Sequence, residues 1–125
     1  MKYNKYYITN KKGKSNCVVR SICKLLNKEY GEVYEELCNI SKELNCNAYN
    51  DIEVFETYFK RYNIEKINYG ENEKIKDLKL ENGRYIILCW DKKDFYHMIS
   101  VIDNIMYDWS DKSFELYAIT IYIKK

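Results

Sequence analysis

Proline and glutamine are absent from the 125 residues of this chain, and only one histidine is present. Lysine, asparagine, isoleucine, tyrosine and glutamate are abundant instead, which we interpret as the residue bias of an AT-rich genome rather than as chemistry. The net charge is +2 in a composition that is 32% charged, so the chain has no strong field of one sign. We therefore expect neither a nucleic acid nor an anionic membrane as a partner.

Long apolar runs are also missing. The longest uninterrupted one covers residues 85–90, far short of the roughly 20 residues that span a bilayer. Residues 1–14 are polar and basic, unlike a signal peptide. We expect a soluble, cytoplasmic protein with one domain over residues 1–125, long enough to bury a core without a disulfide or a metal.

The five cysteines are odd in number and include no C-x-x-C pair, so neither a disulfide framework nor a zinc site is supported. We expect no metal and no cofactor. Cys23, Cys38 and Cys89 lie in apolar stretches and are predicted to be small buried side chains. The 14 tyrosines fall mostly at predicted core positions, which argues against stacking on bases.

Hydrophobic periodicity predicts helices in the first half of the chain and strands in the second. The helices are expected over residues 16–26 and 31–44, and in a third segment capped by Asn50, with Glu53 completing a capping-box pair. The strands are expected over 64–69, 84–90, 96–102, 105–109 and 114–123, with a helical turn or two in 73–80. The predicted fold is α+β, with N-terminal helices packed on a C-terminal antiparallel sheet.

Cys17 lies in the first turn of the first predicted helix, which Ser15 or Asn16 can cap. The free N–H groups and the dipole of a helix start both favour thiolate over thiol. Because the thiolate is the nucleophilic form, the position indicates a reactive cysteine. A small buried cysteine that fills a helix end is the competing interpretation.

His97 is the only imidazole available as a partner for a thiol. If Asp103 and Asn104 are the central residues of a tight hairpin turn, Ile99 lies opposite Asp108. His97 and Asp108 are then diagonal neighbours on one face of the hairpin. An incidental core histidine is the competing interpretation.

The same face is predicted to carry Ile99, Val101 and Met106, which we expect to pack against the first helix and so bring Cys17 beside His97. Asp103 lies at the hairpin tip, about 20 Å along the strand from His97, and is a poor rival to Asp108. Three other aspartates in predicted loops stay open as alternatives: Asp91, Asp94 and Asp111.

The chain resembles small papain-like cysteine peptidases of phages and bacteria, such as bacteriocin-processing peptidases. The resemblance begins with Cys-Val-Val-Arg-Ser-Ile at 17–22 and continues with Leu-Leu-Asn at 25–27 and Val-Tyr-Glu-Glu-Leu at 33–37. It resumes with Gly-Arg-Tyr-Ile-Ile at 83–87 and with His97, the Asp-Asn turn and Asp108 in the order of that family. It covers nearly the whole chain after about Ser15.

The resemblance implies a papain-like fold and a role for each matched residue. Cys17 would attack an acyl carbon, His97 would act as base and then acid, and Asp108 would hold the imidazole. Trp109 would lie near the Asp–His contact, although plain core or rim packing explains it equally well.

The oxyanion hole is where the sequence departs from the family. The Cys17 N–H is one natural donor, but papain-like enzymes usually add a glutamine before the cysteine, and this chain has none. Asn10 or Asn16 could substitute, and Asn16 is equally explained as a helix cap.

These observations predict a thiol hydrolase that cleaves a peptide or isopeptide bond through a thioester acyl-enzyme. Its partner would be a protein or peptide substrate, and oligomeric state is not predicted. Two alternatives keep the same fold. One is a transglutaminase-like acyltransferase with the same triad, and the other is an inactive papain-like protein with a binding or inhibitory role.

Overall fold

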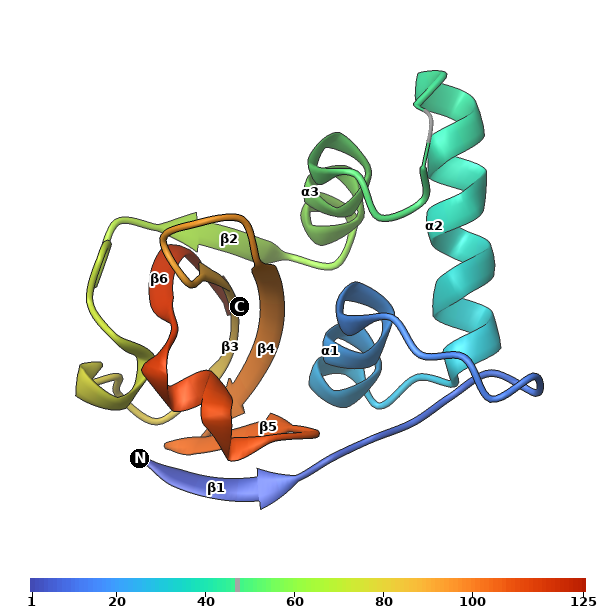
Figure 1. Ribbon diagram of the computed structural model, residues 1–125. Helices are drawn as coiled ribbons and strands as arrows, with labels where there is room; N and C mark the ends of the chain where they lie inside the picture. Colours follow the sequence, from blue (N-terminus) through green and yellow to red (C-terminus); the bar gives the residue numbers. More distant parts are fainter. Residues whose placement is uncertain (47) are drawn as a thin grey trace.

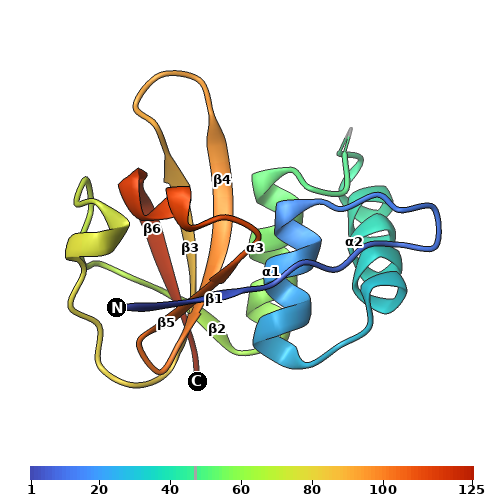
Figure 2. The ribbon, with the colours of Figure 1, turned by 60° about the horizontal axis from the view of Figure 1, so that its bottom comes forward.

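A computed structural model describes residues 1–46 and 48–125 of the chain, which form three helices beside one mixed sheet (Figures 1 and 2). The helices are α1 (Cys17–Leu26), α2 (Tyr30–Leu44) and α3 (Ile52–Arg61). The strands are β1 (Lys2–Lys5), β2 (Ile64–Ile67), β3 (Arg84–Trp90), β4 (Tyr96–Ile102), β5 (Ile105–Asp108) and β6 (Tyr117–Lys124). Two short 3₁₀ turns complete the chain, η1 (Ile75–Asp77) and η2 (Asp111–Glu115).

The six strands lie in the order β1-β5-β4-β3-β6-β2. The α+β prediction is confirmed, but the sheet is not wholly antiparallel, because β1 pairs in parallel with β5. β1 was not predicted: its residues are polar and mostly exposed, so they show no apolar alternation. It nevertheless lies against the strand that carries Asp108, and Tyr3 Oη donates a 2.9 Å hydrogen bond to the Asp108 carbonyl oxygen.

The sheet is covered on both faces, and each face has its own core. One core packs the three helices against the sheet residues Ile86, Met98 and Tyr122. The central strand β3 is therefore buried on both sides, as its apolar run predicts. No helix formed by residues 1–46 and 48–125 is long and apolar enough to cross a bilayer.

The prediction that Ile99, Val101 and Met106 pack against the first helix is wrong. They belong to the second core, on the opposite face, together with Ile75 and Leu78. Side chains alternate along a strand, so the residue of β4 that meets the helical layer is Met98, one position away from His97 and Ile99. The helix approaches His97 along the edge of β4 rather than from above its face.

Helix α1 is fixed to the sheet by polar contacts as well as by its apolar stripe. Ser21 Oγ donates to the Met98 carbonyl at 3.0 Å, and Arg84 Nε donates to the Leu25 carbonyl at 3.0 Å. The second contact satisfies a carbonyl that the end of a helix leaves without an intrahelical partner. The middle and the C-terminal end of α1 are therefore tied to β4 and β3.

The hairpin turn between β4 and β5 is the predicted one. Asp103 and Asn104 both have positive φ angles, of 49° and 64°, as a type I′ turn requires. The turn pairs Ile102 with Ile105 and Ser100 with Tyr107. This register gives the diagonal relation between His97 and Asp108 that the sequence predicted.

Several predicted boundaries need correction. The N-cap of α3 is Asp51 rather than Asn50, and Asp51 accepts a hydrogen bond from the Ala48 N–H. Residues 111–115 form η2, so β6 begins later than predicted. β2 and β5 end earlier than predicted, and only η1 is helical within 73–80. Cys23 and Cys89 are buried, but Cys38 is partly exposed.

Ile22→Ala and Ile52→Ala form a matched test of this packing. Ile22 is 0% exposed in the core between α1 and the sheet, whereas Ile52 is 52% exposed at the start of α3. We expect Ile22→Ala to lower the free energy of unfolding by about 2–5 kcal/mol because it leaves a cavity. Ile52→Ala should change it by only about 0.5 kcal/mol. Equal losses in urea unfolding would contradict the packing described here.

Candidate active site

Cys17 is the first residue of α1, and the residue before it caps the helix. The Asn16 Oδ1 atom accepts hydrogen bonds from the Val18 and Val19 N–H groups, at 2.9 and 3.4 Å. None of the hydrogen bonds found among residues 1–46 and 48–125 uses the Cys17 N–H. A partly buried sulfur and a free N–H therefore lie side by side at a helix start.

The Cys17 sulfur faces the edge of β4. Pairing between β4 and β5 begins at Ser100, so the Met98 peptide lies beyond it, where α1 approaches. Met98 donates its N–H to the Cys17 sulfur, and its carbonyl oxygen accepts from Ser21 Oγ. One residue of β4, through its N–H and its carbonyl group, thus sets the position of the helix and of the sulfur.

His97 is 6% exposed and lies between Cys17 and Asp108. Its Nε2 atom is 2.8 Å from Asp108 Oδ2, so Nδ1 is the ring nitrogen available to the Cys17 sulfur, with which the ring also hydrogen-bonds. The Phe95 ring stacks on the imidazole, with ring centroids 5.6 Å apart. The imidazole is therefore held at one ring nitrogen by the Asp108 carboxylate and on one ring face by Phe95.

Asp108 is 1% exposed, and its carboxylate is surrounded by donors. His97 and the Ser113 hydroxyl both contact Oδ2, and Arg20 Nη2 lies 3.3 Å from Oδ1. The Trp109 N–H also donates to this carboxylate. Burial by itself would raise the pKa of Asp108, but the hydrogen bond from His97 and the other donors hold it below its usual range.

The same contacts shift the pKa values of His97 and Cys17 in opposite directions. Burial opposes the charged imidazole, but the hydrogen bonds to Asp108 and Cys17 raise the pKa of His97 to about 9. Burial likewise opposes the thiolate, but the hydrogen bond and charge of His97 lower the pKa of Cys17. The arrangement therefore favours a thiolate–imidazolium pair at neutral pH.

The structure thus brings all three predicted catalytic residues, Cys17, His97 and Asp108, into one chain of contacts. Asp91 is not in this chain: its Oδ1 accepts from three N–H groups of its own loop. Among the acids of the described residues, Asp108 is the one in contact with His97.

The two oxyanion-hole candidates differ in position. Asn16 is adjacent to Cys17, and because its Oδ1 is the helix cap, its Nδ2 is the end left to donate. Asn10 is exposed, and its Oδ1 accepts from the Lys12 and Lys14 N–H groups of its own loop. Asn16 is therefore the better placed of the two.

Trp109 is 54% exposed, and its side chain borders a hollow with Tyr7, Ser15 and Arg20. Its contact with the Asp–His pair is through its N–H. The ring that stacks on the imidazole is Phe95, which the sequence analysis did not single out.

Arg20 and Ser113 were also missed. Arg20 is buried between Asp108 and Ser15, whose Oγ atom accepts a 2.8 Å hydrogen bond from Arg20 Nη1. One signal was available in the sequence: Arg20 is the one charged residue in a stretch of apolar and small residues, 17–23. A charge buried in such a helix requires a partner of opposite charge. Ser113 carried no signal, because it lies just before the last predicted strand, in a segment to which no element was assigned; the structure places it in η2.

No cluster of three or more metal-binding side chains occurs in the part of the chain that the structure describes. Comparison of the chain with protein-family models, with curated proteins and with solved structures found no match.

The single histidine gives one imidazole resonance to follow by NMR. We expect it to titrate with a pKa of about 9, because Asp108 and Cys17 stabilise the charged ring. In Asp108→Asn the pKa should fall to about 6.5 or lower, because burial then opposes the charge without a carboxylate to offset it. Asp103→Asn, which removes the same charge at the hairpin tip, is the control and should leave the titration unchanged.

The same pair links stability to pH. Folding raises the pKa of His97 from 6.5 to about 9. The resulting stabilisation is fully present below about pH 6.5 and is lost as the pH rises through about 9. An imidazole that titrates near 6.5 in the unmodified protein, or one that Asp108→Asn does not affect, would contradict the described contacts.

Proposed function

We propose that the chain is a papain-like thiol hydrolase that cleaves a peptide or isopeptide bond with Cys17 as nucleophile. The observation that carries the proposal is the continuous contact from the Cys17 sulfur through His97 to the buried Asp108 carboxylate. A sulfur at a helix start, a histidine presented by a strand and an acid on the returning strand occur here in the papain-like order. The bulk of the fold, with helices packed on a sheet, is compatible with that family.

The proposed reaction begins with attack of the Cys17 thiolate on the carbonyl carbon of the scissile bond. The carbonyl electrons move to oxygen and form a tetrahedral oxyanion. His97 then gives its Nδ1 proton to the departing amine as the C–N bond breaks, which leaves a thioester on Cys17 and a neutral imidazole.

Hydrolysis of the thioester completes the cycle. A water molecule attacks the thioester carbon while His97 Nδ1 takes its proton. Collapse of the second tetrahedral intermediate breaks the C–S bond, releases the acid and restores the thiolate–imidazolium pair. Asp108 acts throughout as a positioning residue, because it fixes the ring orientation and stabilises the charged imidazole without receiving the proton.

The oxyanion is proposed to accept hydrogen bonds from the Cys17 N–H and from Asn16 Nδ2. The first donor has no other partner among the described residues, and the second belongs to a side chain that the helix cap already fixes. Preorganised donors of this kind supply a large part of the rate of acyl transfer. The glutamine that papain-like enzymes usually contribute would then be replaced by the residue next to the nucleophile.

Alkylation of Cys17 by iodoacetamide, followed by mass spectrometry of each cysteine peptide, tests the nucleophile. An ordinary thiol loses about tenfold in rate for each pH unit below its pKa of about 8.5. We expect the Cys17 rate to change little between neutral and mildly acidic pH, because the thiol is already ionised there. His97→Ala should restore the steep decline.

Cys46 is an internal control for that experiment. It is partly exposed, and burial together with the adjacent Glu53 carboxylate raises its pKa. Its rate should therefore decline steeply with falling pH in both proteins. If Cys17 follows the same profile as Cys46, and His97→Ala changes nothing, the hydrolase proposal fails and an inactive binding protein becomes the better account.

Acylation by p-nitrophenyl acetate distinguishes the two asparagines. Asn16→Asp keeps the acceptor that caps α1 but removes the amide donor. We expect it to slow acylation roughly 100-fold after correction for the thiolate fraction, while the melting temperature is retained. Asn10→Asp makes the same chemical change in the loop and should have little effect. Equal effects of the two substitutions would exclude Asn16 as the oxyanion donor.

A further inference from the structure

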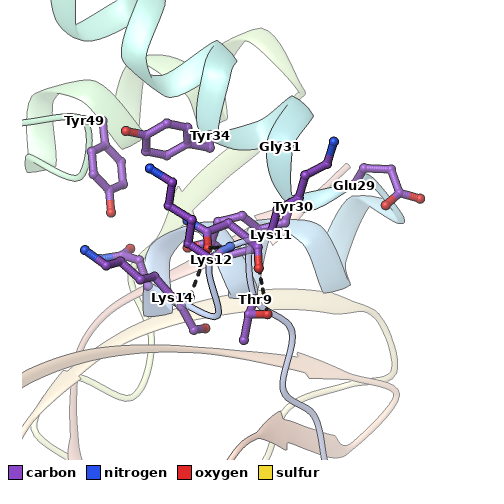
Figure 3. A pocket seen from close by; sticks show the side chains of 12 residues that line it. Thr9, Lys11, Lys12, Lys14, Glu29, Tyr30, Gly31, Tyr34 and Tyr49 are labelled. Carbon is purple, nitrogen blue, oxygen red and sulfur yellow. Dashed lines mark hydrogen bonds between the residues drawn. The ribbon is translucent and has the colours of Figure 1, made fainter.

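A hollow of about 820 Å³ lies beside the residues that lead into α1, and Figure 3 shows it from close by. One wall is the loop over residues 9–16, and the other is formed by the start of α2 with Tyr34 and Tyr49. The hollow reaches Ser15 and Asn16, which immediately precede Cys17 in the chain. Cys17 and Tyr49 are both partly buried and pack against the same core, the one formed by the helices and the sheet. A substrate bound at Cys17 can therefore extend into this hollow.

The charge of the hollow comes from its lysines. Lys11, Lys12 and Lys14 line it, and Glu29 is the one acidic side chain in its wall. None of the ion pairs found among residues 1–46 and 48–125 uses any of the three lysines. Three ammonium groups without carboxylate partners thus outweigh one carboxylate. This excess occurs in a chain whose overall charge is close to balanced.

The loop that carries these lysines has a defined shape. Asn10 Oδ1 accepts from the Lys12 and Lys14 N–H groups at 2.9 and 3.0 Å, and the Asn10 N–H donates to the Lys14 carbonyl at 2.8 Å. Gly13 has a φ of +77°, which closes the turn at low steric cost. The turn therefore holds the three lysines on one wall of the hollow.

The opposite wall is aromatic. The Tyr34 and Tyr49 rings pack edge to face, with centroids 4.8 Å apart, and Figure 3 shows them across the hollow from the loop. Ring faces contact the apolar stem of a side chain, while ammonium groups attract its charged end. The lining thus combines an aromatic surface on which a peptide segment can pack with positive charges that favour a negatively charged segment.

We infer that this hollow is a substrate subsite that selects peptides carrying Glu or Asp next to the bond presented to Cys17. The inference rests on the proposed hydrolase function, since it names the substrate class of the same site. Lysines act as point charges rather than as geometric clamps. The expected recognition is therefore of acidic sequence in general rather than of one residue in one pose, and it should weaken as salt screens the charges.

Binding of two labelled peptides to the Cys17→Ala protein tests the inference without turnover. The peptides are short, rich in glycine and serine, and identical except that one carries glutamate where the other carries glutamine. Fluorescence anisotropy at low salt should give an affinity about tenfold higher for the glutamate peptide. The preference should shrink at high salt.

Two charge-matched triple variants in the same background locate the effect. Replacement of Lys11, Lys12 and Lys14 by glutamine should abolish the preference for the glutamate peptide. Replacement of Lys42, Lys60 and Lys79, which are exposed and lie outside the hollow, removes the same charge and should preserve it. Equal affinities for the two peptides, no measurable binding of either, or equal effects of the two triple variants would overturn the inference.

The failure of this inference and the failure of the proposed function have different signatures. If the two peptides bind equally well but Cys17 of the unmodified protein still reacts with iodoacetamide at mildly acidic pH, only the proposed substrate class is wrong. An ordinary thiol profile for Cys17 removes the hydrolase, whatever the peptides do. A retained preference in that case would identify the hollow as an acidic-peptide binding site of a protein without thiol chemistry.

Discussion

The buried carboxylate of Asp108 is the constraint around which the candidate site is organised. A charge that is 1% exposed is costly unless it is paired and hydrogen-bonded. Here it is paired with Arg20 from α1 and with His97 from β4, and it accepts from Ser113 after β5. The same group therefore connects the helical layer to the sheet and raises the pKa of the imidazole, so the stability of the fold and the proposed chemistry depend on one set of contacts.

Two backbone features bring the helix and the strand to that carboxylate. The type I′ turn at Asp103 and Asn104 sets the register that makes His97 and Asp108 diagonal neighbours. The Met98 N–H and carbonyl group, beyond the last pair with β5, are free to bind Cys17 and Ser21 of α1. A one-residue slip of the hairpin would turn His97 to the opposite face and leave the sulfur without its partner.

Much of this arrangement could be predicted from the sequence, because its determinants are local. The start of α1 follows from the capping Asn16 and the apolar stripe, and the turn follows from an Asp-Asn pair between apolar runs. The packing face of β4 could not be predicted, since alternation shows which residues share a face but not which layer covers it.

Three other features depended on tertiary contacts that leave no pattern in the sequence. β1 has no apolar alternation and is held by its parallel pairing with β5. In β6 the register shifts, so that Leu88 pairs with Thr120 and Cys89 with Ala118. This bulge interrupts the alternation of side chains, so Ala118 lies in the second core and Tyr122 in the core beneath the helices. Arg20 was missed because its partner lies far along the chain.

The central claim is that Cys17 and His97 exist as a thiolate–imidazolium pair in the folded protein at neutral pH. The most direct measurement is the ultraviolet absorbance of the thiolate, taken as the difference between the unmodified protein and Cys17→Ser. The account predicts a clear difference at neutral pH that persists into mildly acidic solution. A difference that emerges only as the pH approaches the ordinary range of a cysteine thiol would contradict it.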